Sequence, residues 1–338
     1  MSIRDVLIVG AGPSGLATAI AAKQQGLDYV LIEKGMLVNG IFNFPTHMVF
    51  FTTPELLEIG GLPLVTPYDK PTRLEALRYY RRVVDTYALQ ISFHEQVVEI
   101  EREDDVFVVT TQDTKGTRRA RHAHAVVLAI GYYDHPNYLG IPGEGLPHVS
   151  HYYTDPHPYY RQRVVIVGGK NSAAETALEL FRAGAHVTLV HRHAVLGDSI
   201  KYWVRPDIDN RIKAGSIAAR FETRVVEITS GSVIVEKVGD GGQVPSREEI
   251  PAEAVFLLTG YRPDMELMRR AGIVYDADTL VPAFDPETFE TNVPNLFIAG
   301  GAVAGRKNQG SIFIENGRFH GESIIRVLSQ RVRQGSLP

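Results

Sequence analysis

The feature that most constrains the fold of this chain is the glycine-rich stretch GAGPSG at residues 10–15. It follows an apolar run at residues 6–9 and precedes an alanine-rich run at residues 16–22, as expected for a turn between a β-strand and an α-helix. In a GxGxxG turn the first glycine permits the bend, the second lets a diphosphate approach the backbone, and the third lets helix and strand pack closely. These three places are filled by Gly10, Gly12 and Gly15. The stretch predicts a Rossmann-like dinucleotide-binding domain, with Pro13 and Ser14 opening its helix.

A charged pair ends the next predicted strand. Residues 29–32 are apolar, and Glu33 and Lys34 follow them. Glu33 stands 18 residues after Gly15, where a carboxylate can accept hydrogen bonds from the hydroxyls of a ribose. We therefore expect both Glu33 and Lys34 to contact the dinucleotide.

The chain contains a second copy of this pattern at residues 164–178. Gly168 and Ala173 take the first and third glycine places, whereas Lys170 stands in the middle one. Phosphate contacts are expected from the amides of the following helix and from six residues of the turn: Gly168, Gly169, Lys170, Asn171, Ser172 and Ala173.

The two copies differ in the residues that end the next strand. In the second copy the strand at residues 186–190 ends in His191, Arg192 and His193. Cations at this place can neutralise the 2′-phosphate of NADPH, so we expect contacts from His191 and Arg192, with Arg192 the main one and Lys201 a further one. The alternative is a solvated strand end. A metal site is not expected, because no nearby acidic or thiol ligand completes a set.

The strand after the first turn ends in an acidic residue, and the strand after the second turn ends in basic residues. This difference indicates FAD at the first turn and NADPH at the second, an arrangement that allows hydride transfer between the two cofactors. The fold class is therefore α/β, with two Rossmann-like dinucleotide-binding domains. Further short strands are expected at residues 91–93, 95–100, 106–111, 125–130, 223–229, 232–238 and 254–258.

The last part of the chain has no counterpart in the second copy. A strand at residues 295–299 and a helix at residues 312–333 are expected there, and we expect them to complete the first domain. The second domain is then an insertion, entered through a Gly- and Pro-rich linker at residues 138–147. The expected division is an FAD-binding domain of residues 1–148 and 272–338 and an NADPH-binding domain of residues 149–271.

The composition of the chain excludes several partners and reaction mechanisms. The chain has 338 residues, a formal net charge of −4 and interspersed charges, which argues against nucleic acid as a partner. Without an apolar run of about 20 residues or a targeting segment, we expect no membrane association and a cytoplasmic location. The chain has no cysteine, which excludes disulfides and every mechanism in which its own sulfur carries electrons.

Three further segments resemble those of two-dinucleotide flavoproteins. Residues 126–132 (VVLAIGY) and 256–264 (FLLTGYRPD) are similar to their paired strand-to-loop segments, and residues 291–301 (TNVPNLFIAGG) to their late FAD segment, although Gly301 replaces the usual acidic residue. The domain order is similar to that of low-molecular-weight thioredoxin reductases. The resemblance implies FAD contacts at His47, Val98, Ala129, Gly131, Gly300 and Gly301, and NADPH contacts at Thr259 and Gly260.

Thioredoxin reductases carry a redox CxxC shortly before the second glycine turn, where this chain reads VSHYYTD at residues 149–155. The chain more closely resembles the bacillithiol disulfide reductase (YpdA-type) family, at residues 43–60, 168–173 and 312–321. Members of that family often have a redox-assigned cysteine in the first turn, as GxGPCG, where this chain has Ser14. Ser14 is then a hydrogen-bond donor to phosphate or flavin, since a hydroxyl cannot exchange with a disulfide.

The resemblance implies an NADPH-dependent FAD oxidoreductase that passes electrons to a low-molecular-weight disulfide, that of bacillithiol or a relative, without a redox cysteine. The reduced flavin would attack the disulfide directly through its C4a position. A proton donor would help the second thiolate leave, and the candidates are His47, Tyr132 and Glu315. Two alternatives stay open: His47 is a packed histidine, and Glu315 forms an ion pair with Arg318. The stretch at residues 306–309 (RKNQ) is either a solvated loop or an anionic substrate site.

Other functions remain open at this point. One is electron transfer to ferredoxin or flavodoxin, as in thioredoxin-reductase-like ferredoxin reductases, which also lack CxxC. A flavin monooxygenase is suggested by residues 131–136 (GYYDHP), which resemble an ATGxxxxP segment, although no FxGxxxH fingerprint lies between the two turns. A redox sensor that binds both cofactors is a non-enzymatic alternative. A homodimer or higher homo-oligomer is expected from the resemblance alone.

Overall fold

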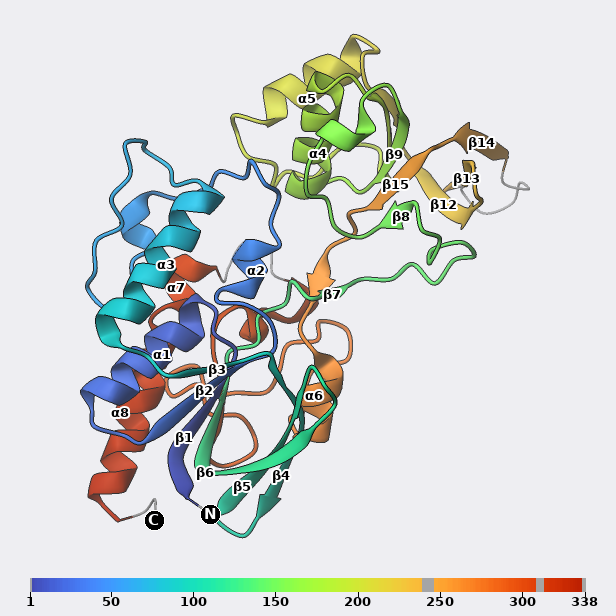
Figure 1. Ribbon diagram of the computed structural model, residues 1–338. Helices are drawn as coiled ribbons and strands as arrows, with labels where there is room; N and C mark the ends of the chain where they lie inside the picture. The colour runs from blue at the N-terminus through green and yellow to red at the C-terminus, as the bar shows by residue number, and fades with distance from the viewer. Residues whose placement is uncertain (1, 239–245, 308–312, 336–338) are drawn as a thin grey trace. The chain divides into compact units, whose positions relative to one another are not determined.

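The computed structural model describes residues 2–238, 246–307 and 313–335, without the side chains of Arg306 and Lys307 (Figure 1). The chain divides into two compact units. Unit 1 consists of Met1–His135 and Tyr261–Pro338, and unit 2 of the continuous segment Pro136–Gly260. The chain passes between the units twice, and the two segments at these boundaries pair with each other as the short strands β7 (His135–Pro136) and β16 (Tyr261–Arg262). The predicted insertion of one α/β unit into another is confirmed.

The chain passes between the units at other residues than the predicted boundaries, which followed residues 148 and 271. The reason is that the Gly- and Pro-rich stretch at 138–147 belongs to unit 2 and does not link the units. The carboxylate of Glu144 accepts hydrogen bonds from the amides of Leu139 (2.8 Å) and Gly140 (2.7 Å) and fixes the turn. The Ile228 amide donates to the Pro142 carbonyl (2.9 Å). Turn residues indicated a loop here, and these hydrogen bonds show that the loop is anchored.

Unit 1 is built on a seven-stranded sheet in the order β3-β2-β1-β6-β5-β4, with β17 paired to β6. Neighbours among β1, β2, β3, β6 and β17 run parallel, whereas β4, β5 and β6 form an antiparallel ribbon. The strand bounds are β1 Ile3–Val9, β2 Tyr29–Glu33, β3 Ile91–Phe93, β4 Glu95–Glu103, β5 Val106–Asp113, β6 Arg118–Leu128 and β17 Leu296–Ile298.

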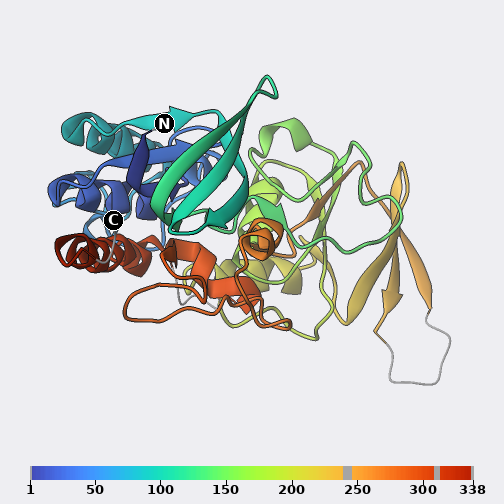
Figure 2. The same cartoon turned by 90° about the horizontal axis from the view of Figure 1, so that it is seen from below.

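Helices α1, α3 and α8 cover one face of this sheet, and the β4–β5 ribbon and α6 lie on the other, as Figure 2 shows from below. The helices of unit 1 are α1 Pro13–Gln24, α2 Asn39–Phe42, α3 Arg73–Tyr87, α6 Met265–Arg270, α7 Ile314–Gly317 and α8 His320–Arg333, with 3₁₀ turns η1 Pro54–Leu56 and η3 Gly300–Lys307.

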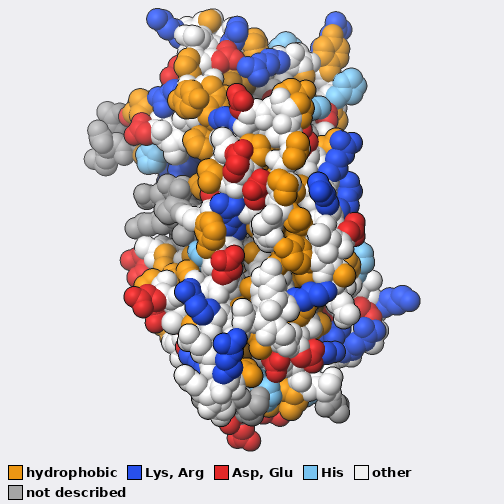
Figure 3. Space-filling view, turned by 90° about the vertical axis from the view of Figure 1, so that its left-hand side faces the viewer, with side chains coloured by type: hydrophobic (Ala, Val, Ile, Leu, Met, Phe, Trp, Pro, Cys, Tyr) orange, Lys and Arg blue, Asp and Glu red, His pale blue; other side chains and the backbone are white. Residues whose placement is uncertain are grey.

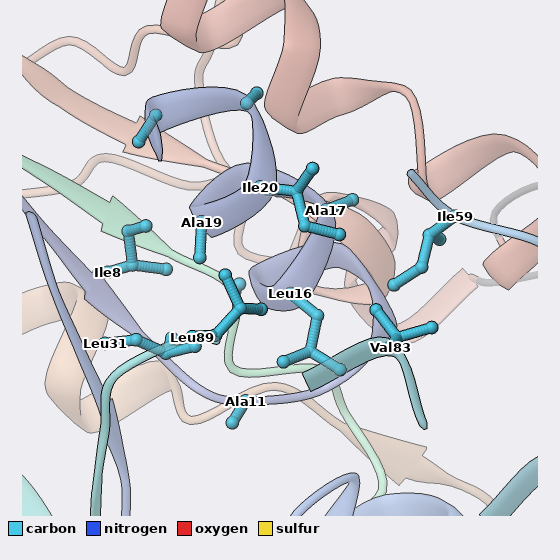
Figure 4. Close-up of a cluster of buried hydrophobic side chains, with 14 of the residues drawn as sticks. Ile8, Ala11, Leu16, Ala17, Ala19, Ile20, Leu31, Ile59, Val83 and Leu89 are labelled. Atoms are coloured by element: carbon cyan, nitrogen blue, oxygen red, sulfur yellow. The ribbon is translucent and has the colours of Figure 1, made fainter. Parts of the chain in front are cut away.

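Alternation along β1 explains why both faces are covered. Val6 and Ile8 point to one face and Leu7 and Val9 to the other, and all four are buried. The first face packs on α1, α3 and α8, and Figure 4 shows Leu16 and neighbouring side chains of α1 filling this layer. A strand buried on both faces reads as the continuous apolar run seen in the sequence.

The start of α8 packs closely on α1. A Cβ atom on Gly321 would lie 2.5 Å from the Thr18 hydroxyl oxygen, so only glycine fits there without displacement. The predicted single helix at 312–333 is wrong, because α7 ends at Gly317 and α8 begins at His320. Gly317 is a weak helix former, and its missing side chain permits close contact with Gly300. The predicted start, Ile312, lies outside the described residues.

Unit 2 repeats the layers of unit 1. A five-stranded parallel sheet, in the order β11-β10-β9-β15-β8, carries α4 on one face and the antiparallel β12–β13–β14 layer on the other. The bounds are β8 Val149–Ser150, β9 Arg163–Val167, β10 His186–Val190, β11 Ala218–Arg220, β12 Thr223–Ile228, β13 Ser232–Lys237, β14 Arg247–Pro251, β15 Ala254–Leu257, α4 Asn171–Arg182, α5 Arg205–Lys213 and the 3₁₀ turn η2 His157–Tyr159.

Charged side chains of both signs are interspersed on the face drawn in Figure 3, in keeping with the net charge of −4. Within the part of the chain that the structure describes, no helix combines the length and apolar character required to cross a membrane.

The packing of α8 on α1 makes a testable prediction. Gly321→Ala should lower the free energy of unfolding by about 1–3 kcal/mol, because the new methyl group overlaps Thr18. Gly40→Ala is the matched control, since a Cβ atom there meets nothing within 4 Å and the residue lies in α2. Urea unfolding of both variants measures the difference. Equal stability of the two would contradict the tight contact.

Candidate cofactor and active sites

The first glycine turn has the geometry of a diphosphate cradle. Gly10 has φ +101°, and a Cβ atom on it would lie 2.5 Å from the Ala129 carbonyl oxygen. A Cβ atom on Gly15 would overlap the Gly10 carbonyl oxygen, so α1 lies directly against the turn. By contrast, a Cβ atom on Gly12 meets nothing within 4 Å. Gly12 therefore faces open space at the N-terminus of α1, which fits the approach of a dinucleotide phosphate.

Glu33 lies at the end of β2 beside this turn. Its two carboxylate oxygens accept hydrogen bonds from the amides of Ala11 (2.8 Å) and Gly35 (2.8 Å). Burial raises the pKa of Glu33, and these two hydrogen bonds oppose the increase. Each oxygen keeps a second lone pair, so the predicted role with ribose hydroxyls remains chemically open. Lys34, in contrast, forms an ion pair with Asp134 (2.8 Å).

Ser14 meets the C-terminal segment of the chain. A Cβ atom on Gly300 would overlap the Ser14 hydroxyl oxygen, and one on Gly317 would lie 3.3 Å from it. Gly300 also has φ +68°, which favours glycine. The Ser14 hydroxyl thus lies where α1, η3 and α7 converge, beside the predicted cofactor turn.

The structure gives a reason for Gly301, which stands where related flavoproteins usually have an acidic residue. A Cβ atom on Gly301 would lie 2.6 Å from the ring of Tyr132. The aromatic ring of one predicted site residue therefore takes the space that a side chain at 301 would need. The other residues predicted to contact FAD are spread along the sheet. Gly131 has φ +62° with open space at its Cβ position, Ala129 is buried, and Val98 lies at a register shift between β4 and β5.

The three proton-donor candidates have different surroundings. His47 is exposed. Tyr132 is half-buried against Gly301. Glu315 is half-buried in the first turn of α7, and burial raises its pKa. The raised pKa of Glu315 favours the protonated form that a proton donor requires.

The predicted pair between Glu315 and Arg318 is not among the ion pairs of the described residues. The guanidinium of Arg318 donates instead to the carbonyl oxygens of Glu55 (2.7 Å), Glu58 (2.6 Å) and Glu315 (3.2 Å). Arg318 therefore anchors α7 to the loop at residues 55–58, and its positive charge partly opposes the increase in the pKa of Glu315. Of the stretch at 306–309, the side chains of Arg306 and Lys307 and the whole of Asn308 and Gln309 lie outside the described residues.

Sequence reasoning missed an aromatic group in unit 1. The ring of Tyr133 contacts Phe44 edge-to-face at 4.9 Å and Tyr261 at 4.5 Å. Its hydroxyl donates to the Asn43 carbonyl oxygen at 3.4 Å. Because these residues lie far apart in the sequence, only their occurrence in the segments 43–60, 131–136 and 256–264, which resemble those of flavoproteins, could have indicated the group.

The second glycine turn, in unit 2, keeps the close backbone contacts of the first turn, whereas different residues occupy its remaining positions. A Cβ atom on Gly168 would lie 2.6 Å from the Leu258 carbonyl oxygen and 2.9 Å from Cβ of Ala173. A Cβ atom on Gly169 would overlap the ring of His191. Burial, followed by the neighbouring His193 and Arg192, lowers the pKa of His191. His191 therefore packs on the turn with a pKa that disfavours its charged form, and its contact with NADPH stays a prediction.

Asn171 has a structural role that the sequence did not indicate. Its amide group donates to the Ser199 carbonyl (2.8 Å), and its side-chain oxygen accepts from the Lys201 amide (2.8 Å). Lys201 itself forms an ion pair with Glu175 (2.6 Å), and the further phosphate contact expected from it stays a prediction. Asn171 therefore anchors the loop at 199–201, while Lys170 and Ser172 remain exposed at the start of α4.

Arg192 has the surroundings expected of a phosphate contact. It is exposed at the end of β10, and its Nε donates to Nε2 of His193 at 3.2 Å. The predicted contacts Thr259 and Gly260 are joined through Asn137. The Thr259 hydroxyl donates to the Asn137 carbonyl (2.8 Å), and the Asn137 amide donates to the Gly260 carbonyl (2.9 Å). Among the described residues, no group of three or more metal-ligating side chains could hold a metal ion.

The two kinds of glycine in the first turn can be separated experimentally. Gly12→Ala should leave the stability of the FAD-free protein within about 1 kcal/mol and weaken FAD binding, because its Cβ atom enters only the open space at the helix start. Gly15→Ala should destabilise the FAD-free protein itself, because its Cβ atom overlaps the Gly10 carbonyl. Denaturation of the FAD-free forms and FAD titration measure these effects. Equal FAD affinity of Gly12→Ala and wild type would contradict the cradle.

Comparisons with known proteins agree with this geometry. Residues 7–300 match the family described as pyridine nucleotide-disulphide oxidoreductase. The chain is 41% identical over 326 residues to the bacilliredoxin reductase Bdr of Bacillus subtilis, an alignment that covers 96% of this chain and 97% of the relative. The solved bacillithiol disulfide reductase Bdr (YpdA) of Bacillus cereus has a TM-score of 0.93 and 39% identity, with 98% of this chain and 100% of that chain covered.

The corresponding Staphylococcus aureus structure has a TM-score of 0.90 and 38% identity, with 99% of this chain and 100% of that chain covered. The similarity therefore extends over both units and both glycine turns. The chain belongs to the pyridine nucleotide-disulphide oxidoreductase family, as an oxidoreductase with FAD and NADPH as its cofactors.

Proposed function

We propose that this protein passes hydride from NADPH to FAD and electrons onward to a low-molecular-weight disulfide, that of bacillithiol or a close relative. The observation that carries the proposal is the match of nearly the whole chain, at 39–41% identity, to proteins named bacilliredoxin reductase and bacillithiol disulfide reductase. The absence of cysteine restricts the route of the electrons in this proposal, because they cannot leave through a protein thiol.

Each glycine turn has a binding role in this proposal. In unit 1 the open face at Gly12 and the first amides of α1 receive the FAD diphosphate, and Glu33 orients its ribose. In unit 2 the start of α4 receives the NADPH diphosphate, and Arg192 neutralises the 2′-phosphate. Bound FAD supplies the two-electron chemistry that connects NADPH oxidation to disulfide reduction.

Proton supply is the second task of the protein. Reduction of one disulfide to two thiols takes two electrons and two protons, whereas the hydride of NADPH carries two electrons and one proton. One further proton must reach a departing thiolate. We assign it to the carboxyl group of Glu315, which is half-buried and has a raised pKa, with His47 and Tyr132 as the alternative donors.

The assembly and location of the protein are part of the same proposal. A homodimer is inferred from the family resemblance, and light scattering of the purified protein tests it. A cytoplasmic location is proposed together with the reductase function. Ferredoxin or flavodoxin as acceptor, a monooxygenase reaction and a sensor role are the competing functions. Steady-state NADPH oxidation with each acceptor, with and without oxygen, distinguishes them.

Anaerobic mixing tests the acceptor and the absence of a sulfur relay together. NADPH should bleach the flavin, and oxidised bacillithiol should restore the oxidised spectrum. Ser14→Ala should reoxidise at a rate within about threefold of wild type, because no thiol or hydroxyl chemistry is assigned to residue 14. A flavin that stays reduced in the presence of oxidised bacillithiol would exclude that substrate. A Ser14→Ala variant that binds FAD and is reduced but is not reoxidised would instead contradict direct transfer from the flavin.

Arg192 carries the prediction for cofactor preference. Arg192→Gln should weaken NADPH relative to NADH by about 10- to 150-fold, since it removes a charge-assisted contact of about 1.5–3 kcal/mol. Lys213→Gln, at the exposed end of α5, makes the same change in net charge and should leave the preference unaltered. Rates of flavin reduction at several concentrations of each nucleotide give the ratio. An unchanged ratio in Arg192→Gln would refute the 2′-phosphate assignment.

A further inference from the structure

A histidine that none of the roles above uses lies behind the late FAD segment. His320 is the first residue of α8 and is only 6% exposed. Its Nδ1 accepts a hydrogen bond from the Gly300 amide at 3.1 Å. Its ring stacks on Phe289, with centroids 4.0 Å apart and planes 18° from parallel. The imidazole is therefore fixed in position by both a hydrogen bond and ring stacking.

The hydrogen bond defines the chemical state of this ring. Nδ1 can accept only when it carries a lone pair, so the imidazole must be neutral with its proton on Nε2. Burial lowers the pKa of His320 to about 4, which keeps the ring neutral at physiological pH. The ring therefore acts as a permanent acceptor rather than as an acid or base.

The amide that His320 accepts belongs to a residue where several segments meet. Gly300 lies against Ser14 of α1 and Gly317 of α7, and the following Gly301 lies against Tyr132. The preceding residue is also fixed, because the Ala299 amide donates to the Leu128 carbonyl at 2.9 Å. Two successive amides thus set the direction of the chain as it enters η3. Without His320, the second of these amides would lose its acceptor.

We propose that His320 is a positioning residue for the flavin site, which holds Gly300 and Gly301 in register with the glycine turn through the Gly300 amide. It acts through the backbone and does not contact the cofactor. This inference rests on the proposed binding of FAD at the first glycine turn. It extends that proposal because it makes FAD retention depend on a buried acceptor outside the cradle itself.

Three variants separate positioning from simple packing. His320→Leu fills a similar volume without an acceptor, and FAD should leave the holoenzyme about tenfold faster, with an altered visible spectrum. His320→Asn places its side-chain oxygen near the position of Nδ1 and should retain FAD at close to the wild-type rate. Phe289→Leu removes the stacked ring but keeps the acceptor, so it should lower stability and leave FAD release within about threefold. Free flavin fluorescence after dilution measures release, and thermal unfolding of the FAD-free forms measures stability.

The outcomes are distinguishable. Equal FAD release from wild type and His320→Leu, or equally fast release from His320→Asn and His320→Leu, would overturn the inference and leave FAD binding itself intact. Purified wild type that neither contains nor takes up FAD would instead overturn the proposed function. If His320→Leu does not fold, His320→Gln replaces it, because the longer side chain moves its oxygen away from Gly300. Faster release from His320→Gln is expected, and wild-type release from it would contradict the role.

Discussion

The close approach of helix α1 to the end of strand β1 is the constraint on which the rest of unit 1 depends. Because Gly15 has no side chain, the Gly10 carbonyl lies against it, and the first amides of α1 emerge at the carboxyl end of the sheet. The same absence of side-chain atoms at Gly300 and Gly317 brings the C-terminal segments to Ser14. Segments from opposite ends of the chain therefore meet at one point because their backbones can touch there.

Unit 2 has the same strand-turn-helix arrangement as unit 1, but a different segment covers its glycine turn. In both units a segment outside the repeated strand-turn-helix pattern covers the glycine turn. In unit 1 this is the C-terminal part of the chain, whereas in unit 2 it is the loop after β10, whose Gly197 amide donates to the Gly169 carbonyl at 2.8 Å. The middle glycine is replaced by Lys170 in unit 2, and the neutral ring of His191 packs on Gly169. The two copies thus share the positions at which a side chain would clash with the backbone, and they differ in the residues around the turn.

The sequence was most informative where one physical requirement allows few residue types. Buried parallel strands had to be apolar, and Gly10, Gly15 and Gly168 had to lack side chains, so these elements were predictable. Strand β14 was missed because its sequence REEIP is mostly charged and, apart from the buried Ile250, exposed, so it is recognisable only through its pairing with β13. The roles of His191, Asn171 and His320 depend on partners that lie far away along the chain or in another element. Residue type and spacing do not specify such partners, and this is also why the unit boundaries were misplaced.

The anchoring of the loop at 199–201 in unit 2 fixes the chain beside the proposed NADPH turn. Both polar groups of the Asn171 side chain bind this loop, so it is held by contacts that the protein alone provides. A preorganised loop loses little conformational freedom when a nucleotide arrives, so more of the contact energy appears as affinity. If NADPH binds at the start of α4 as proposed, the oxidised coenzyme then leaves without unfolding of this loop.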